Sequence, residues 1–405
     1  MNNILRSLFF TVVFSFANHF AFGQLSENFE GTSAPSGWTF SPAGVWGTAQ
    51  PCSGARSISF TGTGQFAVTP AIVNPGFLSF NKKRSSNTTG WSMKVQISTS
   101  ASGPWTDVAT ITTITASCVL EYVDLSAFRG TRYLKFIDNR ASGAHERAID
   151  DVLITQSPTP YNLSSGTYTF NGWASNVAAG SYPANGATGS DNTTGVSSTI
   201  TGANMSFWTH STTDPTVATP FQGYWKCAYN LSSRSRFEGE GTSGISMVNT
   251  GSTQECTSCT AGDCATTEIR PGWIGTVVLS LNSTGRENVA IGWTGRTKVQ
   301  NSRIMRLRMQ YRLGEELDWN DISGQEYESN TSGHSQTFTT TLPSSCNDKA
   351  LVQLRWVYYY VSGSNNRAQL TLDDISVSST LPSSASITTS TITGSPFTMS
   401  NCAST

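Results

Sequence analysis

The chain has 405 residues, enough for two or three domains with real cores, and a formal net charge of −1 at pH 7. Charged residues make up only 13% of it, which excludes a general electrostatic attraction to nucleic acid or to an anionic membrane. The 36 glycines and the aromatic content of 11% favour short strands joined by turns.

The chain begins with a segment typical of a secretory signal. Arg6 supplies a positive charge, residues 8–17 form an apolar run, and small residues precede Gln24. A membrane anchor is the alternative, but His19 interrupts the run, and no later apolar run approaches the roughly 20 residues that span a bilayer. We therefore expect residues 1–23 to be cleaved off and the protein to be secreted, without membrane insertion.

All eight cysteines follow this segment, and an oxidising compartment favours disulfides. Cys52 and Cys118 are the only two in the first third of the chain and are expected to pair. The group Cys256, Cys259 and Cys264 could start a zinc site, but a second C-x-x-C and a clear His partner are missing. Disulfides are therefore expected there too.

Period-two runs of apolar residues recur along the chain, whereas helical periodicity is nearly absent. The runs at 93–99, 133–138, 276–282, 305–312 and 351–361 predict strands, and clusters of Gly, Asn and Ser separate them. The pattern predicts an all-β protein of sandwich or jelly-roll type.

Three signals occur twice in the same order. Residues 95–111 parallel 309–325 as a strand, a turn and a Trp-x-Asp motif, and 133–143 parallel 353–363. Each half then ends in two aspartates and alternating apolar residues, in "RAIDDVLIT" and "RAQLTLDDISV". We therefore expect one architecture used twice, as two tandem jelly-roll β-sandwiches at 24–156 and 167–379. A linker is expected at 157–166, and a Ser/Thr-rich tail at 380–405 is expected to start a further domain.

The paired aspartates need something to neutralise them. Strict strand alternation puts Asp150 and Asp373 on the same face as the apolar residues that follow, which points both toward the core. An inward carboxylate is costly unless donors or a cation compensate it. Hydrogen bonds from Arg147 or Arg367, or from backbone amides, are one solution, and Ca²⁺, which prefers oxygen ligands, is the other.

Carboxylates near Trp319 raise the alternative of a polysaccharide hydrolase. Glu315 and Glu316 lie just before this Trp, and glycosidases work with carboxylate pairs. The first half repeats the Trp without the acids, which favours a solvated turn. His145, His210 and His334 stand in no nucleophile or metal motif, so no catalytic machinery is expected.

Two features suggest contact with a polysaccharide. Arg306, Arg308 and Arg312 share one face of a predicted strand, which either holds an anionic polysaccharide or is a solvated face balanced by nearby glutamates. In "RWVYYY", Trp356 aligns with Phe136 and is expected in the core, whereas Tyr359 is expected to point outward and could stack on a sugar ring.

The stretches "ENFEGTSAPSGWTF", "GQFAVTPAI" and "ERAIDDVLIT" together make the first half resemble the cleaved-adhesin or choice-of-anchor J family, MAM-like jelly-rolls of exported Gram-negative surface proteins. The second half looks like a diverged relative, with "TYTFNGW" at its start. The resemblance implies an adhesive or accessory module, often joined to a catalytic domain, often binding Ca²⁺ and often exported by a type IX system.

The resemblance also implies that the first and last strands of each sandwich are neighbours. Glu27 and Glu30 would then lie near Asp150 and Asp151 and complete an oxygen-rich Ca²⁺ site. The second half offers only Asp373 and Asp374, without a Glu in its first strand.

The interpretation that follows is a non-catalytic adhesion or recognition protein at the cell surface or in the matrix. Its expected partner is carbohydrate or an extracellular-matrix or cell-surface glycan, with the possibility of targeting a catalytic domain beyond residue 405. A polysaccharide hydrolase and a structural stalk are the alternatives.

Overall fold

The computed structural model describes residues 24–85, 92–112, 114–140, 146–171, 204–210, 236–248, 254–255, 269–270 and 274–383. Within these ranges the chain consists of strands and short 3-10 turns with no α-helix, which confirms the predicted all-β class. Several predicted features lie outside the described residues: the signal segment, the tail from residue 384, His145, Cys227, Cys256, Cys259, Cys264 and Cys402.

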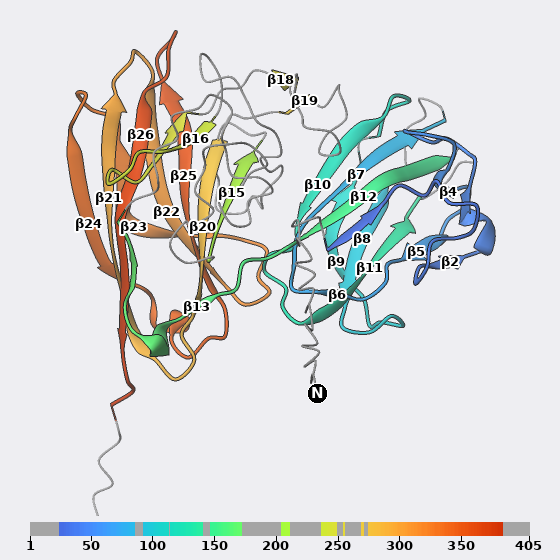
Figure 1. Cartoon of the computed structure of the whole chain (residues 1–405), viewed down its shortest axis with the longest axis horizontal. Coiled ribbons are helices and arrows are strands. Elements are labelled where there is room, and N and C mark those ends of the chain that lie inside the picture. The colour runs from blue at the N-terminus through green and yellow to red at the C-terminus, as the bar shows by residue number, and fades with distance from the viewer. Residues whose placement is uncertain are drawn as a thin grey trace, which may run out of the picture.

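The first sandwich consists of two facing sheets, drawn in blue to green in Figure 1. One sheet has the order β10-β7-β12-β4-β3, with β1 added against β12: β10 (Val119–Asp124), β7 (Pro75–Arg84), β12 (Arg147–Gln156), β4 (Ser57–Phe60), β3 (Trp46–Gly47) and β1 (Leu25–Glu27). The other has the order β2-β5-β11-β8-β9, with β6 added against β11: β2 (Thr39–Ser41), β5 (Phe66–Val68), β11 (Thr131–Asp138), β8 (Met93–Ser98), β9 (Thr106–Ile111) and β6 (Ile72–Val73).

The second sandwich, green to red in Figure 1, repeats this arrangement. Its first sheet has the order β16-β17-β26-β21-β24, with β14 against β26: β16 (Arg236–Gly239), β17 (Ile245–Val248), β26 (Gln369–Thr380), β21 (Glu287–Val299), β24 (Ser335–Thr341) and β14 (Tyr168–Phe170). Its second sheet has the order β13-β20-β25-β22-β23, with β15 against β20: β13 (Tyr161–Asn162), β20 (Ile274–Asn282), β25 (Val352–Ser362), β22 (Ile304–Leu313), β23 (Asn320–Glu328) and β15 (Met205–His210).

The two halves correspond strand by strand. In each first sheet the strand of the aspartate doublet, β12 or β26, lies between a long strand, β7 or β21, and a short one, β4 or β17. The same strand also pairs with β1 or β14, near the start of each half. Glu27 pairs with Val152, and Phe170 pairs with Ile375. The expected jelly-roll architecture, used twice in tandem, is therefore confirmed, and first and last strands are neighbours as expected.

Strand alternation fills both cores. Leu134 and Phe136 on β11, like Leu354 and Trp356 on β25, are buried between the two sheets of their own sandwich. The residues between them therefore point to the outer face of the sheet, because successive side chains alternate.

The predicted linker at 157–166 is partly wrong. β13 adds to the second sandwich in parallel with β20, and Leu163 is buried in the core of that sandwich. Only about four residues therefore join the end of β12 at Gln156 to β13 at Tyr161. Sequence periodicity does not predict β13, because a strand of two residues is too short to show alternation.

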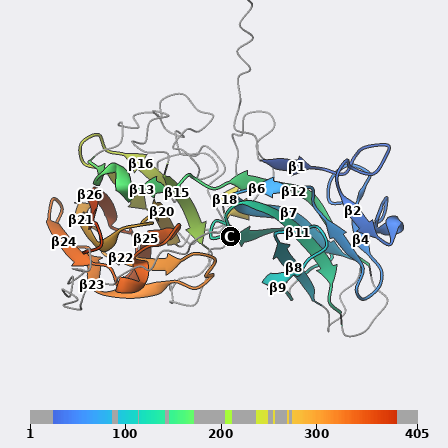
Figure 2. The same cartoon turned by 90° about the horizontal axis from the view of Figure 1, so that it is seen from below.

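The short connection brings the two sandwiches into contact, side by side in Figures 1 and 2. Phe77 of β7 forms a buried cluster with Val278 of β20 and Trp319, with Leu153 of β12 at its edge. The outer face of the first sheet of one sandwich thus packs against the outer face of the second sheet of the other. We call this contact the interdomain interface.

Candidate functional site

The aspartate doublets lie at a β-bulge in both halves. The four residues of β12 from Asp150 to Leu153 lie opposite three residues of β7, and the four residues of β26 from Asp373 to Ser376 lie opposite three residues of β21. The second Asp of each doublet has a left-handed backbone, with φ of 48° at Asp151 and 50° at Asp374. Such a bulge takes one residue out of the alternation.

The predicted inward orientation of Asp150 and Asp373 is therefore wrong. Ile149 and Val152 are both core residues although they are three positions apart, so Asp150 between them points to the outer face. Leu372 and Ile375 bracket Asp373 in the same way. Both carboxylates are nevertheless buried, because a loop covers each of them from outside.

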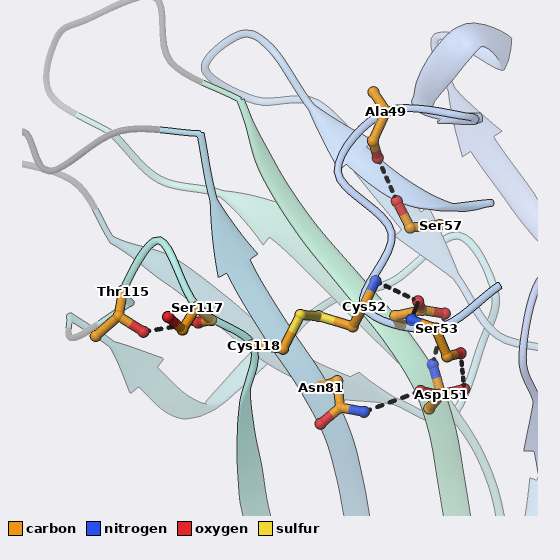
Figure 3. The surroundings of a disulfide bond; sticks show 10 residues. Ala49, Cys52, Ser53, Ser57, Asn81, Thr115, Ser117, Cys118 and Asp151 are labelled. Atoms are coloured by element: carbon orange, nitrogen blue, oxygen red, sulfur yellow. Dashed lines mark hydrogen bonds between the residues drawn. A yellow bond between two sulfur atoms is a disulfide. The ribbon is translucent and has the colours of Figure 1, made fainter. Parts of the chain in front are cut away.

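In the first sandwich the covering loop is the segment between β3 and β4, drawn in Figure 3. Asp150 Oδ2 accepts hydrogen bonds from the backbone N–H groups of Cys52 at 2.8 Å and Ser53 at 3.0 Å. Asp150 Oδ1 accepts the N–H of Asp151 at 2.8 Å. A disulfide joins Cys52 to Cys118 at the start of β10, so the expected pair is formed. Burial raises the pKa of Asp150 to about 6.

Glu30, which follows β1, binds to the same loop. Glu30 accepts the N–H groups of Ala55 at 2.7 Å and Arg56 at 3.0 Å, and these bonds lower its pKa. Glu27 accepts the N–H of Phe29. Glu30 and Asp150 therefore hold the loop between β3 and β4 at different residues, whereas Glu27 bonds within its own segment.

This donor set does not fit Ca²⁺. The hydrogens of amide groups already point at the carboxylate oxygens, where a cation would repel them. Asp151 likewise accepts from Ser53 Oγ and Asn81 Nδ2, at 2.8 and 2.9 Å. Among the described residues, no three His, Cys, Asp or Glu side chains gather in a group that could hold a metal. Ca²⁺ binding thus stays a prediction from the resemblance.

The second sandwich also covers its doublet with a turn, without a disulfide in its described part, but Asp373 Oδ1 is buried there without a hydrogen-bond partner. The turn between β16 and β17 covers Asp373, so closely that a side chain at Gly244 would meet Asp373 Oδ1 at 2.8 Å. Burial raises the pKa of Asp373. Arg147, considered as a partner of Asp150, donates instead to Asp138 at 2.8 Å.

The arginines of β22 divide into two environments. Arg306 donates to Glu326 and Glu328, at 2.8 and 2.7 Å, on a partly exposed face. Arg308 donates to Glu326 at 2.7 Å and to the Tyr359 hydroxyl at 2.8 Å. Tyr359 does leave the core, as predicted, but it is 5% exposed, so it offers no surface for stacking on a sugar.

Arg312 does not belong to that surface, which corrects its assignment as a ligand-binding residue. It is fully buried in the interdomain interface and donates to Asp124 Oδ2 at 2.8 Å and Ser126 Oγ at 3.0 Å, both in the first sandwich. Its guanidinium lies 4.3 Å from the centroid of the Trp319 ring, and that of Arg355 lies 4.5 Å from the same ring.

The carboxylates of the hydrolase hypothesis have structural partners. Glu315 forms an ion pair with Arg132 of the first sandwich, and Glu316 accepts the N–H of Leu313 at 3.1 Å. Trp319 is 1% exposed, so no sugar ring can reach it in this arrangement. The segment is a turn, as favoured from the sequence, but its Trp is buried by the other sandwich rather than solvated.

A different set of residues forms a surface that the sequence analysis missed. The outer face of β5, β11 and β8 carries Phe66, Tyr133 and Lys135, and Trp105 reaches over it from the start of β9. All four side chains are partly exposed and lie outside the core of the sandwich. The Lys135 ammonium lies 4.7 Å from the Phe66 ring centroid and 5.5 Å from that of Trp105. We call this surface the Trp105 face.

The alternation of "YLKFID" could have found this face. Leu134 and Phe136 are the inward residues, so Tyr133 and Lys135 had to point outward. The contribution of Trp105 could not be found in the same way, because it comes from a turn two strands away.

Part of the Trp105 face has a counterpart in the second sandwich. Lys135 pairs with Gln96, as Arg355 pairs with Gln310. The Gln96 amide donates to Asp107 at 2.7 Å. Each half therefore places a Trp, an Asp, a Gln and a basic residue at equivalent positions of equivalent strands: Trp105, Asp107, Gln96 and Lys135 in the first, and Trp319, Asp321, Gln310 and Arg355 in the second. Gln310 donates to Asp321 at 2.8 Å. We call each set a quartet.

No family model matches the chain, and no curated protein matches it. A cleaved adhesin domain of Lys-gingipain from Porphyromonas gingivalis is 21% identical over 33% of this chain and 98% of its own, with a TM-score of 0.28. The tandem CBM22 domain of Paenibacillus barcinonensis Xyn10C is 11% identical over 88% of this chain and 98% of its own, with a TM-score of 0.31. A xylan-binding domain from CBM 22 is 13% identical over 34% and 96%, with a TM-score of 0.26.

These TM-scores are low, so the fold of this chain is taken from its own strand order and no function follows from the likenesses. Within the described part of the chain, none of the elements is a helix with the length and apolar character needed to cross a membrane.

Proposed function

We propose that the chain is a secreted, non-catalytic recognition protein whose first sandwich binds carbohydrate on the Trp105 face. Secretion is supported by the apolar N-terminal segment and by the disulfide between Cys52 and Cys118, since disulfides persist in oxidising compartments. The observation that carries the binding proposal is the group of three partly exposed aromatic rings on one sheet face.

Aromatic rings on a sheet suit sugars for a physical reason. One side of a pyranose ring presents C–H groups, which pack against the π-face of an aromatic ring, while the hydroxyls at the rim require hydrogen-bond partners. Phe66, Trp105 and Tyr133 supply the rings. The partly exposed Gln96 and the exposed Asp107 lie beside them and supply polar groups at the rim.

The second sandwich cannot offer the same surface, because the interdomain interface covers its quartet. Trp319 and Arg355 are 1% and 2% exposed. The head-to-tail packing thus uses one copy of the face to join the sandwiches and leaves the other copy accessible. Carbohydrate binding is therefore expected on the first sandwich only.

The test is a glycan array and affinity gel electrophoresis with the chain from residue 24 onward. Trp105→Ala should weaken retention by about tenfold, the order expected when a stacking aromatic is removed. Val119→Ala, at an exposed apolar position on the other sheet, is the matched control and should leave retention unchanged. Equal retention of the wild type and Trp105→Ala on every bound glycan would refute the site.

A structural spacer is the second candidate, favoured by the interdomain interface itself. The buried cluster around Phe77 and the ion pair between Arg312 and Asp124 hold the two sandwiches in one relative position. A protein that binds no glycan but keeps one fixed elongated shape in small-angle X-ray scattering would favour this function over recognition.

A further inference from the structure

We propose that the Trp105 face selects acidic carbohydrate, with Lys135 as the residue that binds a carboxylate of the sugar. This inference rests on the proposed carbohydrate binding and adds the ligand's charge to it. The ligand class is a polysaccharide built of uronate units.

The chain itself contains one occupied example of the quartet. In the second sandwich the quartet receives the outer face of β7 and β10 from the first sandwich, and this face has an aromatic ring, Phe77, beside a carboxylate, Asp124. Attraction to Asp124 favours the charged form of Arg355, although burial lowers the pKa of this arginine overall. Asp124 pairs directly with Arg312, which lies outside the quartet and whose equivalent in the first sandwich is Ser98. What the quartet itself accepts here is an aromatic ring, Phe77 against Trp319, with an acid near its basic residue.

The charges of the Trp105 face point to the same chemistry. Asp107 is already neutralised by Lys94, with 2.6 Å between Nζ and Oδ2. Lys135, in contrast, has no carboxylate partner among the described residues and is surrounded by Phe66 and Trp105. Burial lowers the pKa of Lys135, because the rings displace part of its water. An anion placed beside Lys135 would restore the lost stabilisation of its charge.

A second copy of the chain is the competing occupant, and its surface does not fit. Where the docking face of the first sandwich has Phe77, Asp124 and Leu153, the equivalent positions of the second sandwich have Ala290, Thr341 and Ser376. The second sandwich thus lacks both the aromatic ring and the acid at this place. Head-to-tail stacking of copies through the Trp105 face is disfavoured for this reason.

The sugar class follows from combining the rings with the cation. A uronate unit has a pyranose ring that can pack on Trp105 or Tyr133, and a carboxylate that can reach Lys135 from that position. A neutral sugar would use the rings alone and leave the lysine without a partner.

Polygalacturonate and its fully methyl-esterified form are the decisive probes, because they share the sugar and differ in charge. We expect the wild type to bind polygalacturonate about tenfold more tightly than the ester at low salt, as a charge-assisted hydrogen bond allows. The preference should shrink as salt is raised, since exposed charges are screened. Lys135→Gln should abolish the preference and keep binding of the ester.

Lys83→Gln is the matched control, because it removes the same charge from β7 in the other sheet. It should keep the preference for the acid. Equal affinity of the wild type for acid and ester, with binding still lost in Trp105→Ala, would overturn the charge selection and leave the proposed carbohydrate binding intact. No binding of any glycan would overturn both. A dimer in sedimentation velocity that Lys135→Gln dissociates would assign the face to a second copy and also overturn the inference.

Discussion

Replacing Arg312 by Met should cost the protein about 3–5 kcal/mol of unfolding free energy, the usual loss when one partner of a buried ion pair is removed. The methionine keeps most of the apolar stem but takes away the charge. Asp124 is 3% exposed and would lose the arginine that it pairs with directly in the interface that buries it. The ring of Trp319 would also lose the guanidinium that lies 4.3 Å from its centroid.

Urea denaturation followed by tryptophan fluorescence measures this loss, and small-angle X-ray scattering shows where it occurs. Because the pair of Arg312 and Asp124 joins the two sandwiches, its removal should loosen their contact and increase the radius of gyration. Asp124→Asn combined with Arg312→Met should be more stable than Arg312→Met alone, since a neutral amide needs no counter-charge.

Arg306→Met is the matched control on the same strand and the same face. Its partners Glu326 and Glu328 are partly exposed, so at most about 1 kcal/mol should be lost. If Arg312→Met lowers the free energy of unfolding no more than Arg306→Met and leaves the scattering curve unchanged, the buried ion pair does not stabilise the interface.

Three further outcomes are expected. Cys52→Ser with Cys118→Ser opens a loop with a sequence separation of 66 and should cost about 4 kcal/mol, measured by urea denaturation. Asp150 has its pKa raised by burial to about 6, with the neighbouring Asp151 adding repulsion, so the fold favours the protonated form. The protonated Asp150 therefore stabilises the fold fully below the unfolded pKa of about 3.9, and this stabilisation is lost as pH rises through about 6. Asp150→Asn should make the melting temperature less dependent on pH between these values. An unchanged pH profile would refute this. EDTA should leave the melting temperature unchanged, because backbone N–H groups already donate to the carboxylate oxygens of Asp150. A lower melting temperature in EDTA would instead support a Ca²⁺ site.

The sequence by itself determined the strands, their repetition and the disulfide. Period-two alternation is a local property, so it could be traced in "YLKFID" and "LVQLRWVYYYV" without knowing their neighbours. The same order of motifs in both halves predicted two sandwiches of one architecture, and the strand order bears this out. Cys52 and Cys118 were paired by position in the chain alone.

Only the tertiary structure decided which way the critical side chains point and what covers them. Asp150 and Asp373 point away from the core because a bulge inserts an extra, left-handed residue into the strand. A bulge is defined by the pairing with the neighbouring strand, so counting alternate residues along the sequence does not reveal it. Trp105 and Trp319 carry the same motif, yet one is partly exposed and the other buried. That difference arises from the packing of one sandwich on the other, a long-range contact that no local pattern encodes.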